Sequence, residues 1–172
     1  MSTQTCSTCG KSKANLECGL CHQAICKACA HFLEPDQFSF LPRIPPELSH
    51  TTYCEACFND KVTPQIESYA QTLEAAREVI IFEKNQGKET RLIKRDEELV
   101  YVTDCPDYDE AILKMAFLAV LIKCNAVIDI DLKSKKIKSG GYQSTVWSGS
   151  GRPANVKSDQ LIKDRSFRDN PN

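Results

Sequence analysis

Two segments of the chain carry apolar residues at the spacing of an amphipathic helix. The first follows Thr63-Pro64, a pair that suits a helix start because threonine caps free amides and proline fits the first helical position. The apolar positions after it recur every three to four residues: Ile66, Tyr69, Ala70, Leu73 and Ala76. We therefore expect a linker helix within residues 61–78.

The second helix is expected over Tyr108–Lys123. Asp107 precedes it as an N-cap and Glu110 follows three residues later, a variant of the capping box. Its apolar residues cover much more than one stripe: Ile112, Leu113, Met115, Ala116, Phe117, Leu118, Ala119, Leu121 and Ile122. Such a wide face predicts burial on more than one side, either between a sheet and another element or in an oligomer interface.

Strand patterns occur on both sides of this second helix. Before it, β-rich runs predict strands at Val79–Glu83, Glu89–Lys94 and Leu99–Thr103. The first two are expected to form a hairpin around the turn at residues 85–88.

After the helix, Ala126–Leu132 predicts a fourth strand, Lys133–Gly141 a charged turn and Tyr142–Ser148 a fifth strand. Three residues are expected to end the fifth strand: Gly149, Gly151 and Pro153. Residues 79–157 thus predict a β-β-β-α-β-β domain of α/β sandwich type, and the whole chain an α+β fold.

Eight of the ten cysteines form four CxxC pairs within residues 1–60: Cys6/Cys9, Cys18/Cys21, Cys26/Cys29 and Cys54/Cys57. A two-residue gap lets both thiolates of a pair reach one ion from a tight turn, and a structural zinc site takes four such ligands. Four pairs therefore predict two Zn²⁺ ions per chain. A site of four cysteines has no open position, so we expect this metal to support folding and not catalysis.

A disulfide framework or redox-active pairs are the alternatives to zinc. No apolar leader segment precedes Cys6, so we expect a reducing, cytoplasmic location, which disfavours disulfides. Cys105 and Cys124 lie outside the cluster, and we expect both to be small buried hydrophobic residues.

The segment His31–Thr52 separates the third and fourth cysteine pairs. Its four prolines favour an ordered extended loop over a helix. The apolar residues of this segment, Phe32, Phe38, Phe40 and Leu41, have two candidate roles: packing under the zinc sites, or facing a partner. If they face a partner, Phe38, Phe40 and Leu41 are the candidate contact surface.

Charge is spread unevenly along a chain whose formal net charge is −1. That balance gives the whole molecule no general attraction to nucleic acid or anionic lipid, so we do not expect it to bind nucleic acid. Residues 133–172 carry nine basic and three acidic residues. We expect residues 158–172 to form a basic, flexible tail. Residues 79–157 contain no paired-acid, Ser/His or phosphate-loop signature, and we do not expect an enzyme.

The first module has the pattern CxxC-x8-CxxC-x4-CxxC-x24-CxxC, with Gly10 after the second cysteine and Phe58 after the eighth. It resembles the FYVE-type zinc finger, a relative of the RING and PHD cross-brace fingers. The resemblance implies interleaved sites. One zinc would bind Cys6, Cys9, Cys26 and Cys29, and the other Cys18, Cys21, Cys54 and Cys57. With both sets complete, His22 and His31 are expected to lie beside the sites or on the surface.

The phosphoinositide-binding motif of FYVE domains is missing. Where that family has a basic Arg/Lys and His-His stretch before the third cysteine, this chain has Ala14-Asn15-Leu16-Glu17. Without cations there is little to hold a phosphate, so membrane targeting is a disfavoured alternative, with Lys11 and Lys13 as weak contacts. A RING-like ubiquitin-transfer adaptor is another alternative, with Leu20, Ile25 and Pro42 as its groove.

Residues 79–157 resemble the small bacterial YbjQ-like domains, which are labelled heavy-metal-binding and form ring oligomers. The likeness rests on Ala111–Lys123, on residues 125–131 and on residues 145–151. It implies a homo-oligomer, and a heavy-metal sensor or store as a further alternative. We therefore expect a non-enzymatic adaptor: a FYVE-like zinc finger that binds protein partners not identifiable from the sequence, presented by an oligomerising domain.

Overall fold

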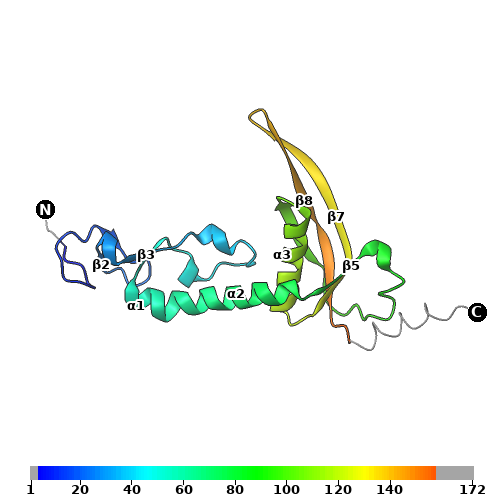
Figure 1. Ribbon diagram of the computed structural model, residues 1–172, viewed down its shortest axis with the longest axis horizontal. Coiled ribbons are helices and arrows are strands. Elements are labelled where there is room, and N and C mark those ends of the chain that lie inside the picture. The colour runs from blue at the N-terminus through cyan, green and yellow to red at the C-terminus, as the bar shows by residue number, and fades with distance from the viewer. Residues whose placement is uncertain (1–3, 158–172) are drawn as a thin grey trace, which may run out of the picture. The chain divides into compact units, whose positions relative to one another are not determined.

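A computed structural model describes residues 4–157, and the expected tail at 158–172 lies outside the described residues (Figure 1). The chain divides into two compact units, residues 1–71 and 72–172. Their boundary falls inside helix α2 (Thr63–Arg77). Helices and sheets occur together without a repeating βαβ order, which confirms the expected α+β fold.

The first unit contains two small antiparallel sheets. Strand β1 (Leu16–Glu17) pairs with β2 (Ala24–Ile25), and β3 (Ala30–Phe32) pairs with β4 (Thr52–Cys54). Short 3₁₀ turns occur at Lys27–Cys29, Pro35–Phe38 and Pro46–Leu48. The last two begin at prolines, whose fixed φ suits the first position of a helical turn.

The helix expected to begin at Thr63 begins earlier in the chain. Helix α1 (Glu55–Cys57) continues through a π-helical segment, Phe58–Val62, into α2. Thr63 is helical (φ −53°, ψ −46°), so the expectation that it caps the helix is wrong. Cys54 occupies the cap, because its Sγ accepts a hydrogen bond from the Cys57 amide at 3.4 Å.

The core of the first unit lies beneath the cysteine turns. Ile25, Leu48, Tyr53 and Val62 are completely buried in it. Of the two roles left open for the 31–52 segment, packing is the one observed for two of its aromatic residues: Phe38 is 3% and Phe40 8% exposed, whereas Phe32 is 58% exposed. These two rings are therefore not a surface for a partner.

The second unit is built on one four-stranded sheet with the order β5-β7-β8-β6. Strand β5 (Ile80–Glu83) runs parallel to β7 (Ala126–Ser139), while β8 (Tyr142–Ala154) is antiparallel to both β7 and β6 (Val100–Cys105).

Helix α3 (Tyr108–Leu121) packs on one face of this sheet, where Met115 meets Val127 and Ile130 around Gly151 (Figure 1). Leu121 and Ile122 at the end of the helix are 42% and 47% exposed. Cys105 and Cys124 are buried, as expected.

The expected hairpin between residues 79–83 and 89–94 is wrong. Strand β5 pairs with β7 instead, and residues 84–98 form a 3₁₀ turn and a loop. Ile93 of this loop joins a core with Phe82, Ala126 and Ile128. Because side chains alternate along a strand, this core lies on the sheet face opposite Val127 and α3. The loop thus covers that face and does not extend the sheet.

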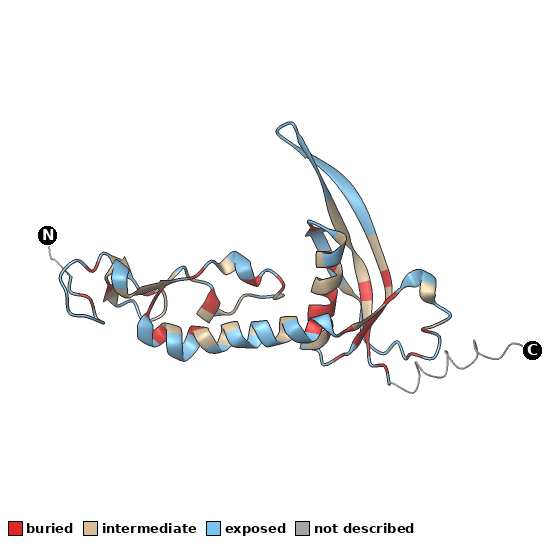
Figure 2. Ribbon diagram, viewed as in Figure 1, coloured by how far each residue is buried: buried red, intermediate tan, exposed pale blue. Residues whose placement is uncertain are grey.

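The expected charged turn at 133–141 and the expected strand break after Ser148 are also wrong. Strands β7 and β8 stay paired as far as Ser139↔Tyr142, and only Gly140-Gly141 forms the turn, with φ of +55° and +90°. The strand passes through Gly149 because β7 approaches too closely there for a side chain: a Cβ would lie 2.0 Å from the Asp131 carbonyl oxygen. Figure 2 shows that the distal part of this hairpin is exposed.

A β-bulge in β7 connects the loop to the sheet. The register shifts between Ile128 and Asp131, and Asp129 takes φ +54°. Its carboxylate accepts hydrogen bonds from Arg95 at 2.8 and 3.0 Å. Bulges re-aim side chains in this way, and here the re-aimed carboxylate anchors the loop. Within residues 4–157, no helix combines the length and the hydrophobicity that crossing a membrane would require.

Candidate metal centres

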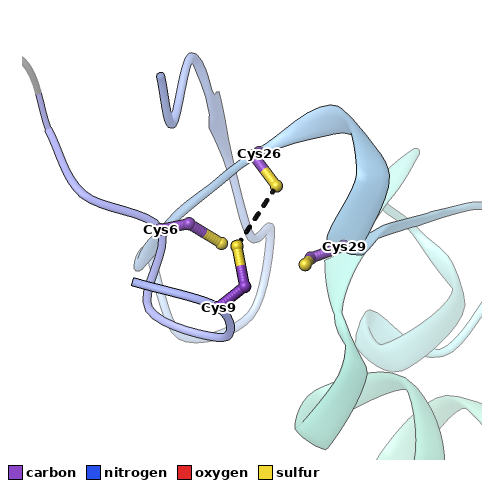
Figure 3. Close-up of side chains that lie close together, drawn as sticks. All are labelled: Cys6, Cys9, Cys26 and Cys29. Atoms are coloured by element: carbon purple, nitrogen blue, oxygen red, sulfur yellow. Dashed lines mark hydrogen bonds between the residues drawn. The ribbon is translucent and has the colours of Figure 1, made fainter. Parts of the chain in front are cut away.

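Four cysteine sulfurs from two separate turns meet at the first candidate centre. Cys6, Cys9, Cys26 and Cys29 place their Sγ atoms within 4.8 Å of one another (Figure 3). The sulfurs of Cys9 and Cys26 are 3.8 Å apart. Figure 3 shows the four side chains directed toward a common point.

A second group has the same construction. Cys18, Cys21, Cys54 and Cys57 again place their sulfurs within 4.8 Å of one another, and the Cys21–Cys54 separation is 3.7 Å. The first and third pairs of the sequence make one group, and the second and fourth make the other. The two groups are therefore interleaved in a cross-brace-like arrangement, and each consists of the cysteines that the resemblance implied.

Each group combines two different turn geometries. In one, the residue after the second cysteine has a left-handed backbone: Gly10 at φ +70° and His22 at φ +59°. The amide of this residue donates a hydrogen bond to the carbonyl oxygen of the first cysteine and so closes the turn. Gly10 donates to Cys6 and His22 to Cys18, both at 2.9 Å. Glycine takes this conformation freely, which explains Gly10.

In the other geometry the first cysteine is a helix N-cap. Cys26 (φ −85°, ψ 158°) precedes the 3₁₀ turn Lys27–Cys29, and Cys54 (φ −75°, ψ 159°) precedes α1. A residue in this extended conformation directs its side chain back over the first turn. The second cysteine of each pair, three residues on, therefore lies beside it.

Hydrogen bonding and charge make the thiols of each group unequal. Backbone amides of Cys9 and Cys26 lower the pKa of Cys6 to about 6, while hydrogen bonds to the Cys26 and Cys9 side chains raise the pKa of Cys29 to about 12. In the second group burial, followed by the bond to Cys54, raises the pKa of Cys57 to about 12. Four thiols this close cannot all ionise unless a cation offsets their charge.

The sulfur spacing fits a metal and not a disulfide. A tetrahedral ion with metal–sulfur bonds of about 2.3 Å separates its sulfurs by about 3.8 Å. The observed separations are 3.8 and 3.7 Å, whereas a disulfide bond is about 2.05 Å long. All ten cysteines are free. Both groups could therefore hold a metal ion.

The histidines near these groups are engaged elsewhere. His22 Nδ1 lies 2.7 Å from the Glu17 carboxylate, and the His31 ring stacks on Phe58 with centroids 4.5 Å apart. Within residues 4–157 no third cluster of His, Cys, Asp or Glu side chains is arranged to hold a metal. The second unit therefore offers no ligand set for a heavy-metal site among its described residues.

One surface expectation for the first unit is wrong. Ile25 is completely buried and cannot line a RING-like groove with Leu20 and Pro42. A groove of about 310 Å³ lies instead beside the cysteine turns, with Thr8, Gln23 and Glu55 in its lining. No sequence signal marks this groove, because its lining residues form no motif and come from three separate segments.

Comparisons with protein-family models, with curated proteins and with solved structures gave no match for this chain. The arrangement of the site itself is therefore the basis for assigning a function.

Proposed function

We propose that this chain is a non-enzymatic, zinc-binding adaptor, in which a FYVE-like finger without a phosphoinositide-binding motif presents a surface to a protein partner. The observation that carries the proposal is the pair of interleaved four-cysteine groups. A finger built this way has its loops held by metal and its surface available for contact.

Zinc is the metal that the donor set favours. Four thiolates in tetrahedral arrangement select zinc or iron, and the CxxC spacing on a closed site is typical of structural zinc. A closed site leaves no position for substrate or water. The adaptor role follows from this, because the finger can act only through what its surface binds.

Phe32 is our candidate contact residue. It lies on β3 and is 58% exposed, whereas Phe38 and Phe40 of the same segment are buried. An exposed aromatic ring on a rigid element is a common anchor of protein interfaces. The neighbouring residue His31 stacks on Phe58 and helps to hold the strand in place.

The second unit is proposed to form homo-oligomers. Leu121 and Ile122 leave apolar surface at the end of α3, and β5 and β6 are the outer strands of the sheet. Oligomerisation would multiply weak contacts of the finger into useful avidity. Native mass spectrometry of the metal-loaded chain tests this directly, since a monomer at micromolar concentration would contradict it.

The adaptor proposal predicts two zinc ions per chain and partner binding that depends on Phe32. Native mass spectrometry and metal analysis count the ions. For partner binding, proteins crosslinked to the intact chain are compared with those crosslinked to Phe32→Ser. Leu92→Ser is the matched control, because Leu92 is similarly exposed (55%) but lies in the second unit.

We expect Phe32→Ser to lose at least one specific partner while keeping both zinc ions, and Leu92→Ser to lose none. A chain without zinc, or identical partners for all three proteins, would contradict the proposal.

A further inference from the structure

The distal part of the β7–β8 hairpin forms a two-stranded arm, defined here as residues 133–146. The last pair between β5 and β7 is Glu83↔Ile130, and the last between β6 and β8 is Cys105↔Trp147. Beyond these points β7 and β8 pair only with each other, up to Ser139↔Tyr142. At about 3.3 Å per residue, a strand of seven residues makes the arm about 20 Å long.

The arm carries positive charge only. It contains Lys133, Lys135, Lys136 and Lys138, all exposed, and no acidic residue occurs between positions 132 and 151. Among the described residues, none of these lysines has an ion-pair partner. Four unpaired ammonium groups on one short ribbon attract a polyanion strongly.

The four lysines all belong to β7 but lie on both faces of the ribbon. Because side chains alternate along a strand, Lys133 and Lys135 point to one face, and Lys136 and Lys138 to the other. The partner strand contributes neutral hydrogen-bonding groups at this level, such as Gln143 and Thr145. The β7 edge of the arm is therefore cationic, and its lysines point to both faces of the ribbon.

We propose that this arm binds in the groove of a nucleic-acid duplex. A groove has phosphate backbones on both walls, so an inserted edge can offer the lysines of opposite faces to opposite backbones. The major groove of B-DNA is about 12 Å wide and admits a two-stranded β-ribbon. Tyr142, 85% exposed beside the Gly140-Gly141 turn, supplies an aromatic ring at the tip.

A flat anionic surface fits the arm less well. A membrane would meet the tip, one face or the edge of the ribbon. At the tip or on one face, some of the lysines would lie further from the surface than the screening length of about 8 Å at physiological salt. At the edge, the lysines of both faces would meet a single anionic plane, whereas a groove offers each face its own phosphate backbone. The net charge of −1, which argued against nucleic acid, averages over the chain and does not describe this arm.

Fluorescence anisotropy of the full, zinc-loaded chain with a short labelled DNA duplex tests the proposal. Four phosphate contacts predict an affinity that falls on the order of 100-fold between about 50 and 200 mM salt. The variant K133Q/K135Q/K136Q/K138Q should lose most of this binding and most of the salt dependence. The control K61Q/K88Q/R91Q/K94Q removes four exposed cations outside the arm and should bind as the unmodified chain does.

Three results would overturn the proposal. The first is equal binding by both variants, which would assign the contact to cations elsewhere. The second is tighter binding to vesicles with anionic lipid, or to polyglutamate, than to the duplex. The third is self-association of the arm variant without any duplex binding by the unmodified chain, because the lysines would then only protect exposed strand edges. Zinc content is unaffected in each case, which separates this proposal from that for the finger.

Discussion

At the scale of single residues, the cysteines act through two backbone conformations as much as through their sulfurs. The residues after Cys9 and Cys21 are left-handed, and Cys26 and Cys54 are extended caps. Each centre takes one turn of each kind. The chemistry of the site thus depends on local φ and ψ values that a CxxC spacing already favours.

Tyr108 gives a pH-dependent test at the same scale. Its hydroxyl donates to the Glu83 carboxylate, and this bond together with burial raises the pKa of Tyr108 to about 12. The folded state therefore keeps the proton where an unfolded tyrosine, with pKa 10.0, has lost it. The stabilisation is complete below pH 10.0 and disappears as the pH rises toward 12.

We expect the stability difference between the unmodified chain and Tyr108→Phe to be constant below pH 10.0 and to shrink above it. Urea unfolding of both proteins over this range measures the difference. If the gap stays constant up to pH 12, the Glu83 bond does not contribute as described.

At the scale of elements, two glycines allow β8 to continue beside β7 without a break. Gly149 and Gly151 resemble strand breakers in sequence, but the close approach of β7 requires them. At Gly149 the obstruction is backbone, which cannot rotate away, whereas at Gly151 it is the side chains of Val127, Met115 and Ile130. A residue that weakens an isolated strand is thus necessary for this pair of strands.

Gly149→Ala should therefore destabilise the second unit by at least about 2 kcal/mol, since its Cβ must displace the backbone of Asp131 and Leu132. Gly87→Ala is the matched control: its nearest atom is at 3.8 Å, and its φ of −59° suits alanine. The control should change stability by less than about 1 kcal/mol. Thermal unfolding followed by circular dichroism compares them, and equal losses would be inconsistent with the close approach.

At the scale of the whole molecule, stability is expected to come from different sources in the two units. The first has short strands and a small core around the cysteine groups. A structural zinc site contributes about 10 kcal/mol or more to the folding of such a module. The second unit has a four-stranded sheet with apolar residues on both faces and, among its described residues, no metal cluster.

Cys26→Ser should consequently unfold the finger while the sheet of the second unit persists. Hydrogen exchange resolved by peptide would show lost protection in β1–β4 and retained protection in β7 and β8. Cys124→Ser changes a buried cysteine outside the groups and should keep both zinc ions. Loss of protection throughout the chain would mean that the units unfold together.

The sequence by itself determined what depends on neighbours along the chain. The CxxC spacing identified the eight sulfurs that gather, and helical periodicity with the Asp107 cap located α3 to within two residues. These features are local, because turn geometry and capping involve residues three or four positions apart.

Only the tertiary structure decided what depends on distant segments. It gave β5 the partner β7 in place of residues 89–94. The paired residues lie 46 or 47 positions apart in the sequence, and Phe82 and Ile93 pack in one core with Ala126 and Ile128. In the structure the helix cap is Cys54 and not the expected Thr63. The segment expected to be a charged turn is paired as part of the arm. The lysine-rich part of β7 resembles a loop in sequence, because both of its faces are exposed to water and no periodic pattern of apolar residues is needed. Hydrogen bonding to β8, which the sequence does not reveal, extends β7 to Ser139.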